Sequence, residues 1–92
     1  MFSDEEPMLV SLVDDLLESI AFQEYVFFED KDRMGNGLYD EKIFYLNFEK
    51  ERAKKLRSNI QNAWHESQAK YDGIKNEVKR EIEAIKAALK KI

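Results

Sequence analysis

The feature that most constrains the fold is an apolar stripe that runs through the second half of the chain. Its members recur every three, four or seven residues, a spacing that places them on one face of an α-helix. They are Leu46, Ala53, Leu56, Ile60, Ala63, Trp64, Tyr71, Ile74, Val78, Ile82, Ile85, Leu89 and Ile92. Only Glu49 and Ser67 interrupt the stripe with polar side chains. The pattern predicts a long amphipathic helix over about residues 40–91.

This segment can be one continuous helix or two helices with a turn near Gly73. The stripe keeps its phase through Asp72 and Gly73. A single Gly costs a continuous helix only about 1 kcal/mol relative to Ala. We therefore expect one continuous helix. The alternative, a break near Gly73, would fold the last helix back and give a compact three-helix bundle.

A second helical pattern lies near the N-terminus. Ser3 and Glu6 have the spacing of a capping box, and Pro7 is tolerated in a first helical turn. Apolar residues then recur at helical spacing. They are Leu9, Val13, Leu16, Ile20 and Phe27. The pattern predicts a helix over about residues 5–29.

An Asp- and Gly-rich loop over residues 29–39 joins the two predicted helices. Its Gly-Asn-Gly sequence over residues 35–37 favours a turn. An alternative pairs residues 25–28 with residues 44–48 as a β-hairpin, but only the second segment alternates, and the connection is long for a hairpin. We expect one all-α domain over residues 1–92, assembled as a coiled coil or a helical bundle.

The unequal lengths of the two predicted helices imply self-association. A helix over residues 40–91 would extend about 78 Å, whereas a first helix of about 25 residues extends about 38 Å. The shorter helix would leave an aliphatic seam uncovered, and such a seam is typical of an interface. Its members are Ile74, Val78, Ile82, Ile85 and Leu89. The sequence thus predicts a homodimer that forms through the long helix.

Charge is divided unequally between the two halves of the chain. Residues 1–50 carry 13 acidic and 4 basic side chains, whereas residues 51–92 carry 6 acidic and 11 basic ones. The halves attract each other, either within one chain or between two antiparallel chains. The net charge of −4 and the glutamates between the lysines argue against nucleic-acid binding.

The acidic side of the first predicted helix suggests an alternative function. Asp14, Asp15 and Glu18 lie on its polar side, and aromatic residues that could anchor a partner follow them. Such a surface could mimic nucleic acid. The chain would then be a small acidic inhibitor, of the phage type, that occupies the basic cleft of a nucleic-acid enzyme.

Most catalytic and metal-binding motifs are absent from this sequence, and nothing singles out an acid–base pair among its 19 Asp and Glu residues. It has no Cys and a single His, which excludes thiolate sites and centres built from several histidines. His65-Glu66 begins the zinc-protease pattern, but Ala69 stands where the second histidine ligand must be. We expect no catalytic residue, no cofactor and no enzymatic activity.

Residues 30–41 resemble an EF-hand calcium loop. Gly35 takes the sixth position, at the sharp turn, whereas Met34 takes the fifth position, which needs an oxygen ligand. The resemblance implies a calcium-responsive loop as a second alternative function, although we expect no bound metal. The weak candidate ligands are Asp30, Asp32, Asn36 and Glu41.

Most aromatic residues lie close to this loop in the sequence. They are Phe22, Tyr25, Phe27, Phe28, Tyr39, Phe44, Tyr45 and Phe48. We expect them to form the main core where the helix ends meet, and the alternative is a binding pocket beside the loop. With no apolar run long enough to span a membrane, the sequence predicts a cytoplasmic, non-enzymatic module that binds proteins and self-associates through its C-terminal helix.

Overall fold

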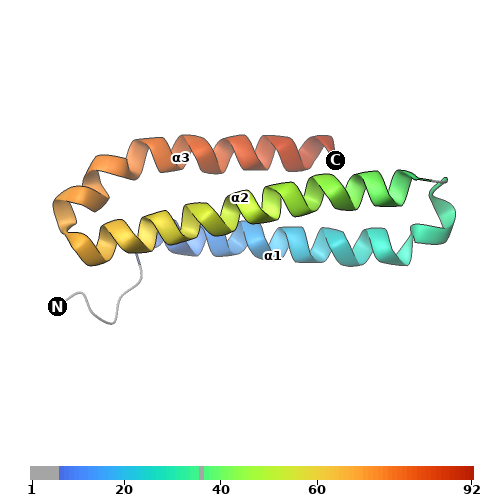
Figure 1. Cartoon of the computed structure of the whole chain (residues 1–92), viewed down its shortest axis with the longest axis horizontal. Helices are drawn as coiled ribbons and strands as arrows, with labels where there is room; N and C mark the ends of the chain where they lie inside the picture. Colours follow the sequence, from blue (N-terminus) through green and yellow to red (C-terminus); the bar gives the residue numbers. More distant parts are fainter. Residues whose placement is uncertain (1–6, 36) are drawn as a thin grey trace.

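The computed structural model describes residues 7–35 and 37–92, and it is an antiparallel bundle of three α-helices (Figure 1). The helices are α1 (Met8–Glu29), α2 (Leu38–Glu66) and α3 (Gln68–Lys91), and a short 3-10 helix, η1 (Lys31–Arg33), lies in the first connection. The predicted all-α class is confirmed. The hairpin alternative is wrong, because both of its segments lie inside α-helices.

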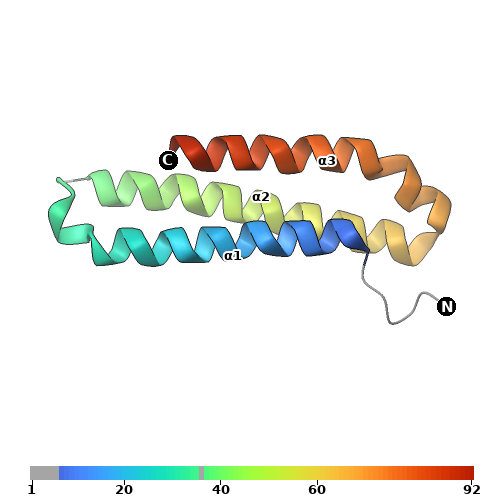
Figure 2. The same ribbon diagram turned by 180° about the vertical axis from the view of Figure 1, so that it is seen from behind.

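The chain runs up, down and up through the bundle. Figure 2, the view from behind, shows α1 and α3 running in the same direction and α2 running against them. Both views also show that α1 and α2 continue past the end of α3 toward the η1 loop. The end of the molecule that carries this loop is therefore built mainly from two helices.

The long C-terminal helix is broken, and the break lies at Ser67. Ser67 is extended, with φ −172° and ψ 158°, and separates α2 from α3 by a single residue. Its hydroxyl oxygen accepts a hydrogen bond from the Lys70 N–H at 3.1 Å, as an N-cap residue does. The prediction of a continuous helix over residues 40–91 was wrong. The alternative of a break near Gly73 was also misplaced, because Gly73 lies inside α3.

Helix length explains why the turn at Ser67 suits this chain. The 24 residues of α3 and the 29 residues of α2 extend about 36 and 44 Å. These lengths match well enough for α3 to cover most of α2. Trp64 and Tyr71 face each other across the turn in an edge-to-face contact, with ring centroids 5.0 Å apart.

The predicted aliphatic seam lies inside the bundle. Val78, Ile82 and Ile85 are buried, and Ile74 and Leu89 pack against the same core at partial exposure. The other buried members of this core come from all three helices: Leu9, Val10, Val13, Leu16, Ala53, Leu56, Ile60 and Tyr71. The homodimer was predicted on the premise that this seam is uncovered. That premise is wrong, because α1 and α2 of the same chain cover the seam.

Ion pairs between helices join the acidic and the basic parts of the chain. Asp14 of α1 accepts a hydrogen bond from Arg57 Nε of α2 at 2.7 Å, and Glu24 of α1 lies 3.3 Å from Lys50 Nζ of α2. Of the two arrangements that the charge pattern allowed, attraction within one chain is the one observed here.

Helix α1 begins at Met8, later than residue 5, with the extended Pro7 as its N-cap residue. The predicted capping box of Ser3 and Glu6 lies outside the described residues. At the other end of the first connection, Gly37 precedes α2 with φ 83°, in the left-handed region that favours glycine.

Across the described residues, each helix is too short or too polar to cross a membrane.

Candidate functional site

Six aromatic side chains lie on the surface although the sequence predicted them in the core. They are Phe22, Tyr25, Phe28, Phe44, Tyr45 and Phe48, and each is 50–67% exposed. We refer to these six residues as the aromatic face. Of the eight aromatic residues near the loop, only Phe27 is buried. The prediction that they form the main core was wrong.

Helical geometry explains the exposure of the aromatic face. Two residues that are two positions apart on an α-helix lie about 200° apart around its axis. Phe22 follows the buried Ile20 by two positions. Phe44 and Phe48 stand two positions before and after the buried Leu46. Because the buried residues point into the bundle, these aromatic rings point away from it.

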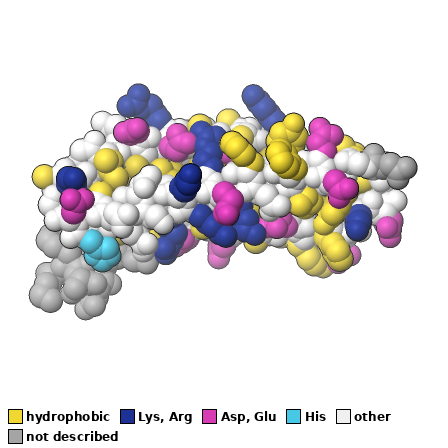
Figure 3. Space-filling model, viewed as in Figure 1, with side chains coloured by type: hydrophobic (Ala, Val, Ile, Leu, Met, Phe, Trp, Pro, Cys, Tyr) yellow, Lys and Arg dark blue, Asp and Glu magenta, His cyan; other side chains and the backbone are white. Residues whose placement is uncertain are grey.

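The aromatic face lies on the half of α1 and α2 that is nearest to the η1 loop. Figure 3 shows the largest groups of hydrophobic side chains on this half of the visible surface, with charged side chains among and around them. Phe22, Tyr25 and Phe28 form the α1 part of the face, and Phe44, Tyr45 and Phe48 form the α2 part. Both parts rest on long helices, which hold the rings in place.

The α2 part of the aromatic face contains a hollow of about 490 Å³. Phe44 and Phe48 supply its apolar lining, and the charged residues that line it are Glu51, Arg52 and Lys55. Phe44 also contacts Tyr45 in an edge-to-face arrangement, with ring centroids 5.5 Å apart and an interplanar angle of 80°. A hydrophobic side chain of a partner could enter this hollow beside two aromatic rings.

A second hollow, of about 290 Å³, lies where α2 begins and α3 ends. Leu38 and Tyr45 from α2 and Ala88 from α3 supply its apolar lining, together with Ile92. The Lys42 ammonium group donates a hydrogen bond to the Ile92 carbonyl oxygen beside it. Tyr45 thus borders a hollow on the α3 side, whereas Phe44 and Phe48 border one on the outer side of α2.

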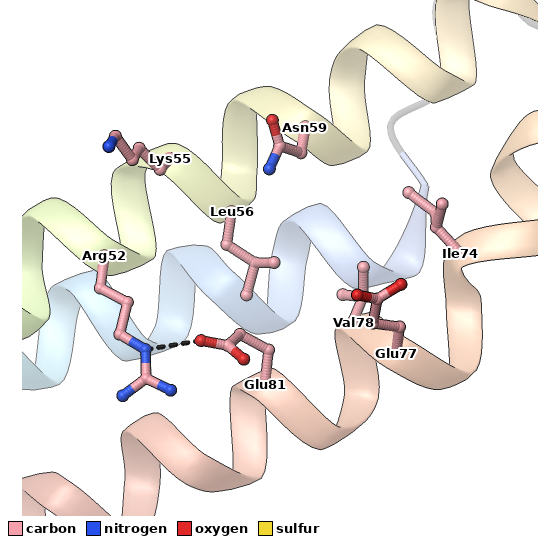
Figure 4. Close-up of a pocket in the computed structure, with 8 residues that line it drawn as sticks. All are labelled: Arg52, Lys55, Leu56, Asn59, Ile74, Glu77, Val78 and Glu81. Carbon is pink, nitrogen blue, oxygen red and sulfur yellow. Dashed lines mark hydrogen bonds and ion pairs between the residues drawn. The ribbon is translucent and has the colours of Figure 1, made fainter.

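A third hollow, of about 330 Å³, runs between α2 and α3 and contains an ion pair (Figure 4). Arg52 Nε donates to Glu81 Oε1 at 2.5 Å, and Arg52 also lies 3.2 Å from the buried Glu49. The hydrogen bond to Glu81 raises the pKa of Arg52 above its ordinary value, so the guanidinium stays charged. Because the Arg52–Glu81 pair joins the two helices, we assign this hollow a role in holding α3 to α2.

The described candidate calcium ligands, Asp30, Asp32 and Glu41, belong to no group of side chains that could hold a metal ion. Among the described residues, no group of three or more Asp, Glu, His or Cys side chains could hold a metal ion. Asp30 lies 3.9 Å from Arg33, and Glu41 belongs to the first turn of α2. Asn36 lies outside the described residues.

The predicted acidic face is divided by the fold. Asp14 is paired with Arg57, so its charge serves the contact between α1 and α2. Asp15 and Glu18 are exposed, and they share the outer side of α1 with Phe22 and Tyr25. The two free carboxylates therefore belong to a mixed acidic and aromatic surface.

The described residues form a three-helix bundle with six exposed aromatic rings. The chain matches no protein-family model, and neither a curated protein nor a solved structure is significantly similar to it.

Proposed function

We propose that this chain is a non-enzymatic protein-binding module that holds its partner with the aromatic face. The observation that carries the proposal is the exposure of six aromatic rings on the outer sides of two helices. A whole aromatic residue presents about 200 Å², so the exposed fractions leave on the order of 700 Å² of surface open to solvent. This area is divided between the α1 part and the α2 part of the face, and exposed apolar patches on a folded protein mark interaction sites.

The chemistry of the aromatic face supports a protein as its partner. A stable protein interface covers about 800 Å² on each side, which is close to the aromatic area available. Tyrosine and arginine are enriched among the residues that dominate binding energy, and Tyr25, Tyr45 and Arg52 lie in or beside the face. The hollow beside Phe44 and Phe48 gives a partner's side chain a place to insert.

Selection from a random peptide library tests this proposal without knowledge of the natural partner. The immobilised chain is kept at nanomolar concentration during the selection. The affinity of each enriched peptide for the parent chain and for its variants is then measured by fluorescence polarisation. We expect a variant with Phe44→Ser and Phe48→Ser to bind the enriched peptides at least about thirtyfold more weakly, because a lost anchor costs at least about 2 kcal/mol.

Met8→Ser is the matched control, since Met8 is 74% exposed and lies outside the aromatic face. It should bind the peptides as tightly as the parent chain. Peptides that bind the doubly substituted variant unchanged would refute the assignment of the face.

The outer side of α1 supports a second candidate function, the binding of a basic surface such as the cleft of a nucleic-acid enzyme. Asp15, Glu18 and Glu29 are exposed, and none of them makes an ion pair within the described residues. They flank Phe22 and Tyr25, so charge and aromatic anchors occur together. Binding to a panel of nucleases and polymerases should weaken with salt. Unchanged binding after Asp15→Lys and Glu18→Lys would exclude this function.

A further inference from the structure

We propose that a second copy of this chain docks on the α2 part of the aromatic face, with the two α2 helices antiparallel and Phe48 on the two-fold axis. The inference rests on the proposed function and names a partner for the same surface. It differs from the seam-based dimer of the sequence analysis, because the residues involved are exposed in the folded bundle.

The outer side of α2 has a symmetrical arrangement about Phe48. Glu41 and Lys55 lie seven residues before and after it, which is about two helical turns in each direction. Phe44 and Arg52 lie four residues away on either side, and Tyr45 and Glu51 lie three residues away. The stripe from Glu41 to Lys55 extends about 21 Å along the helix.

An antiparallel two-fold arrangement places complementary groups opposite each other. Glu41 of each copy faces Lys55 of the other, which joins opposite charges at both ends of the contact. Phe44 comes opposite Arg52 of the second copy, and because that guanidinium is bonded to Glu81 and Glu49 of its own chain, the ring meets the aliphatic part of the Arg52 side chain. This contact also brings Phe44 of one copy to the hollow that Phe48 and Arg52 of the other copy line.

The flanking charges select the antiparallel arrangement over the parallel one. In a parallel pair, Glu41 would face Glu41 and Lys55 would face Lys55, so like charges would repel at both ends. Both residues are exposed, and neither makes an ion pair within the described residues. Their charges are therefore available for contacts with a second copy.

The size of the contact determines the concentration at which to look for the dimer. The α2 part contains three of the six exposed aromatic residues, so its buried area falls at the low end for specific interfaces, below about 1,200 Å² in total. We expect dissociation in the micromolar range. In sedimentation equilibrium, the average mass should rise from 10.9 kDa toward twice that value between low and high micromolar concentrations.

Charge reversal tests the arrangement itself. Glu41→Lys alone and Lys55→Glu alone should each weaken the dimer several-fold, because each places like charges opposite each other. The double variant should restore dimerisation to near the parent level, which only the antiparallel register with Phe48 at its centre predicts. Phe48→Glu should abolish the dimer, since it brings two carboxylates together at the axis. Lys79→Glu, at an exposed position on α3, should change nothing.

Each of these measurements supports or overturns the proposal, provided that circular dichroism shows the same helicity for each variant as for the parent chain. A parent chain that stays monomeric at high micromolar concentration would overturn it, and so would a dimer that Phe48→Glu leaves intact. A monomeric chain that still binds selected peptides through Phe44 and Phe48 would overturn the second copy as partner but leave the proposed function standing. A chain that neither dimerises nor selects peptides would overturn both.

Discussion

Replacing Ile85 with Ala tests whether the C-terminal aliphatic seam belongs to the core of one chain. Ile85 is completely buried, and it lies in the same cluster as residues from α1 and α2. Truncating a buried Ile to Ala costs about 2–5 kcal/mol, because apolar contacts are lost and a cavity remains. A chain of this size has a total stability of about 5–14 kcal/mol. The substitution should therefore remove a large part of the free energy of unfolding.

The expected shift is large enough for an ordinary thermal melt. A loss of about 3 kcal/mol lowers the melting temperature of a domain of this length by about 12–24 °C. Circular dichroism at 222 nm reports it, together with urea unfolding at fixed temperature. Leu89→Ala is the graded control, because Leu89 is only partly buried and should lose roughly half as much.

The dependence on protein concentration separates the two explanations of the seam. If α1 and α2 cover Ile85 within one chain, the melting temperature of the Ile85→Ala variant will not change with concentration. The measurement is made in the Phe48→Glu background, so that association through the aromatic face does not contribute. A midpoint that rises with concentration, or a loss no larger than that of a surface substitution, would refute the burial of the seam within the chain.

Three further predictions follow from the connections and the loop. Gly73→Ala should raise the free energy of unfolding by up to about 1 kcal/mol, because Gly73 is helical and a Cβ there meets nothing within 4 Å. Urea titration measures this change. A loss of stability would mean that the chain turns at Gly73 after all. Ser67→Ala should lower the melting temperature by about 4–8 °C, since an N-cap contributes about 1 kcal/mol, and an unchanged melt would show that the cap is not needed. The parent chain should show no calcium-dependent rise in melting temperature, and Asp30→Ala with Asp32→Ala should melt alike with and without Ca²⁺; a rise of several degrees that this variant loses would establish a calcium site.

The apolar periodicity predicted the helices well but not the position of the turn. An apolar stripe that stays in phase indicates which side of a helix is buried. It is compatible both with one straight helix and with two helices joined by a turn. The sequence did contain a signal at the true break, because Ser67 is one of two polar interruptions of the stripe and a preferred N-cap residue. Glycine at position 73 was the more conspicuous signal, yet an exposed helical position tolerates it.

The second polar interruption, Glu49, has a different physical origin. It is buried beside Arg52, which also bonds to Glu81 of α3. No local pattern could show this, because the third member of the cluster comes from a helix that returns only after the turn. The position of α3, and with it the burial of the aliphatic seam, depends on contacts between residues that are far apart in the sequence.

The aromatic face could have been found from helical phase alone. Leu46 belongs to the apolar stripe, so Phe44 and Phe48 must lie on the opposite side of the helix. Composition pointed the other way, since a cluster of large aromatic residues in a short chain usually fills its core. The angular position of each ring decides between core and surface, whereas hydrophobicity does not.

The residues that form the core and the residues of the proposed binding surface are different members of the same two helices. Leu46 and Ile20 are completely buried in the bundle, whereas Phe22, Phe44 and Phe48, two positions away from them, lie on the surface. The fold therefore does not account for Phe22, Phe44 or Phe48, because polar residues at these outer positions would form the same bundle with less apolar surface exposed to water. A partner that covers the rings does account for them. The outer sides of α1 and α2 are therefore where we propose that a partner docks.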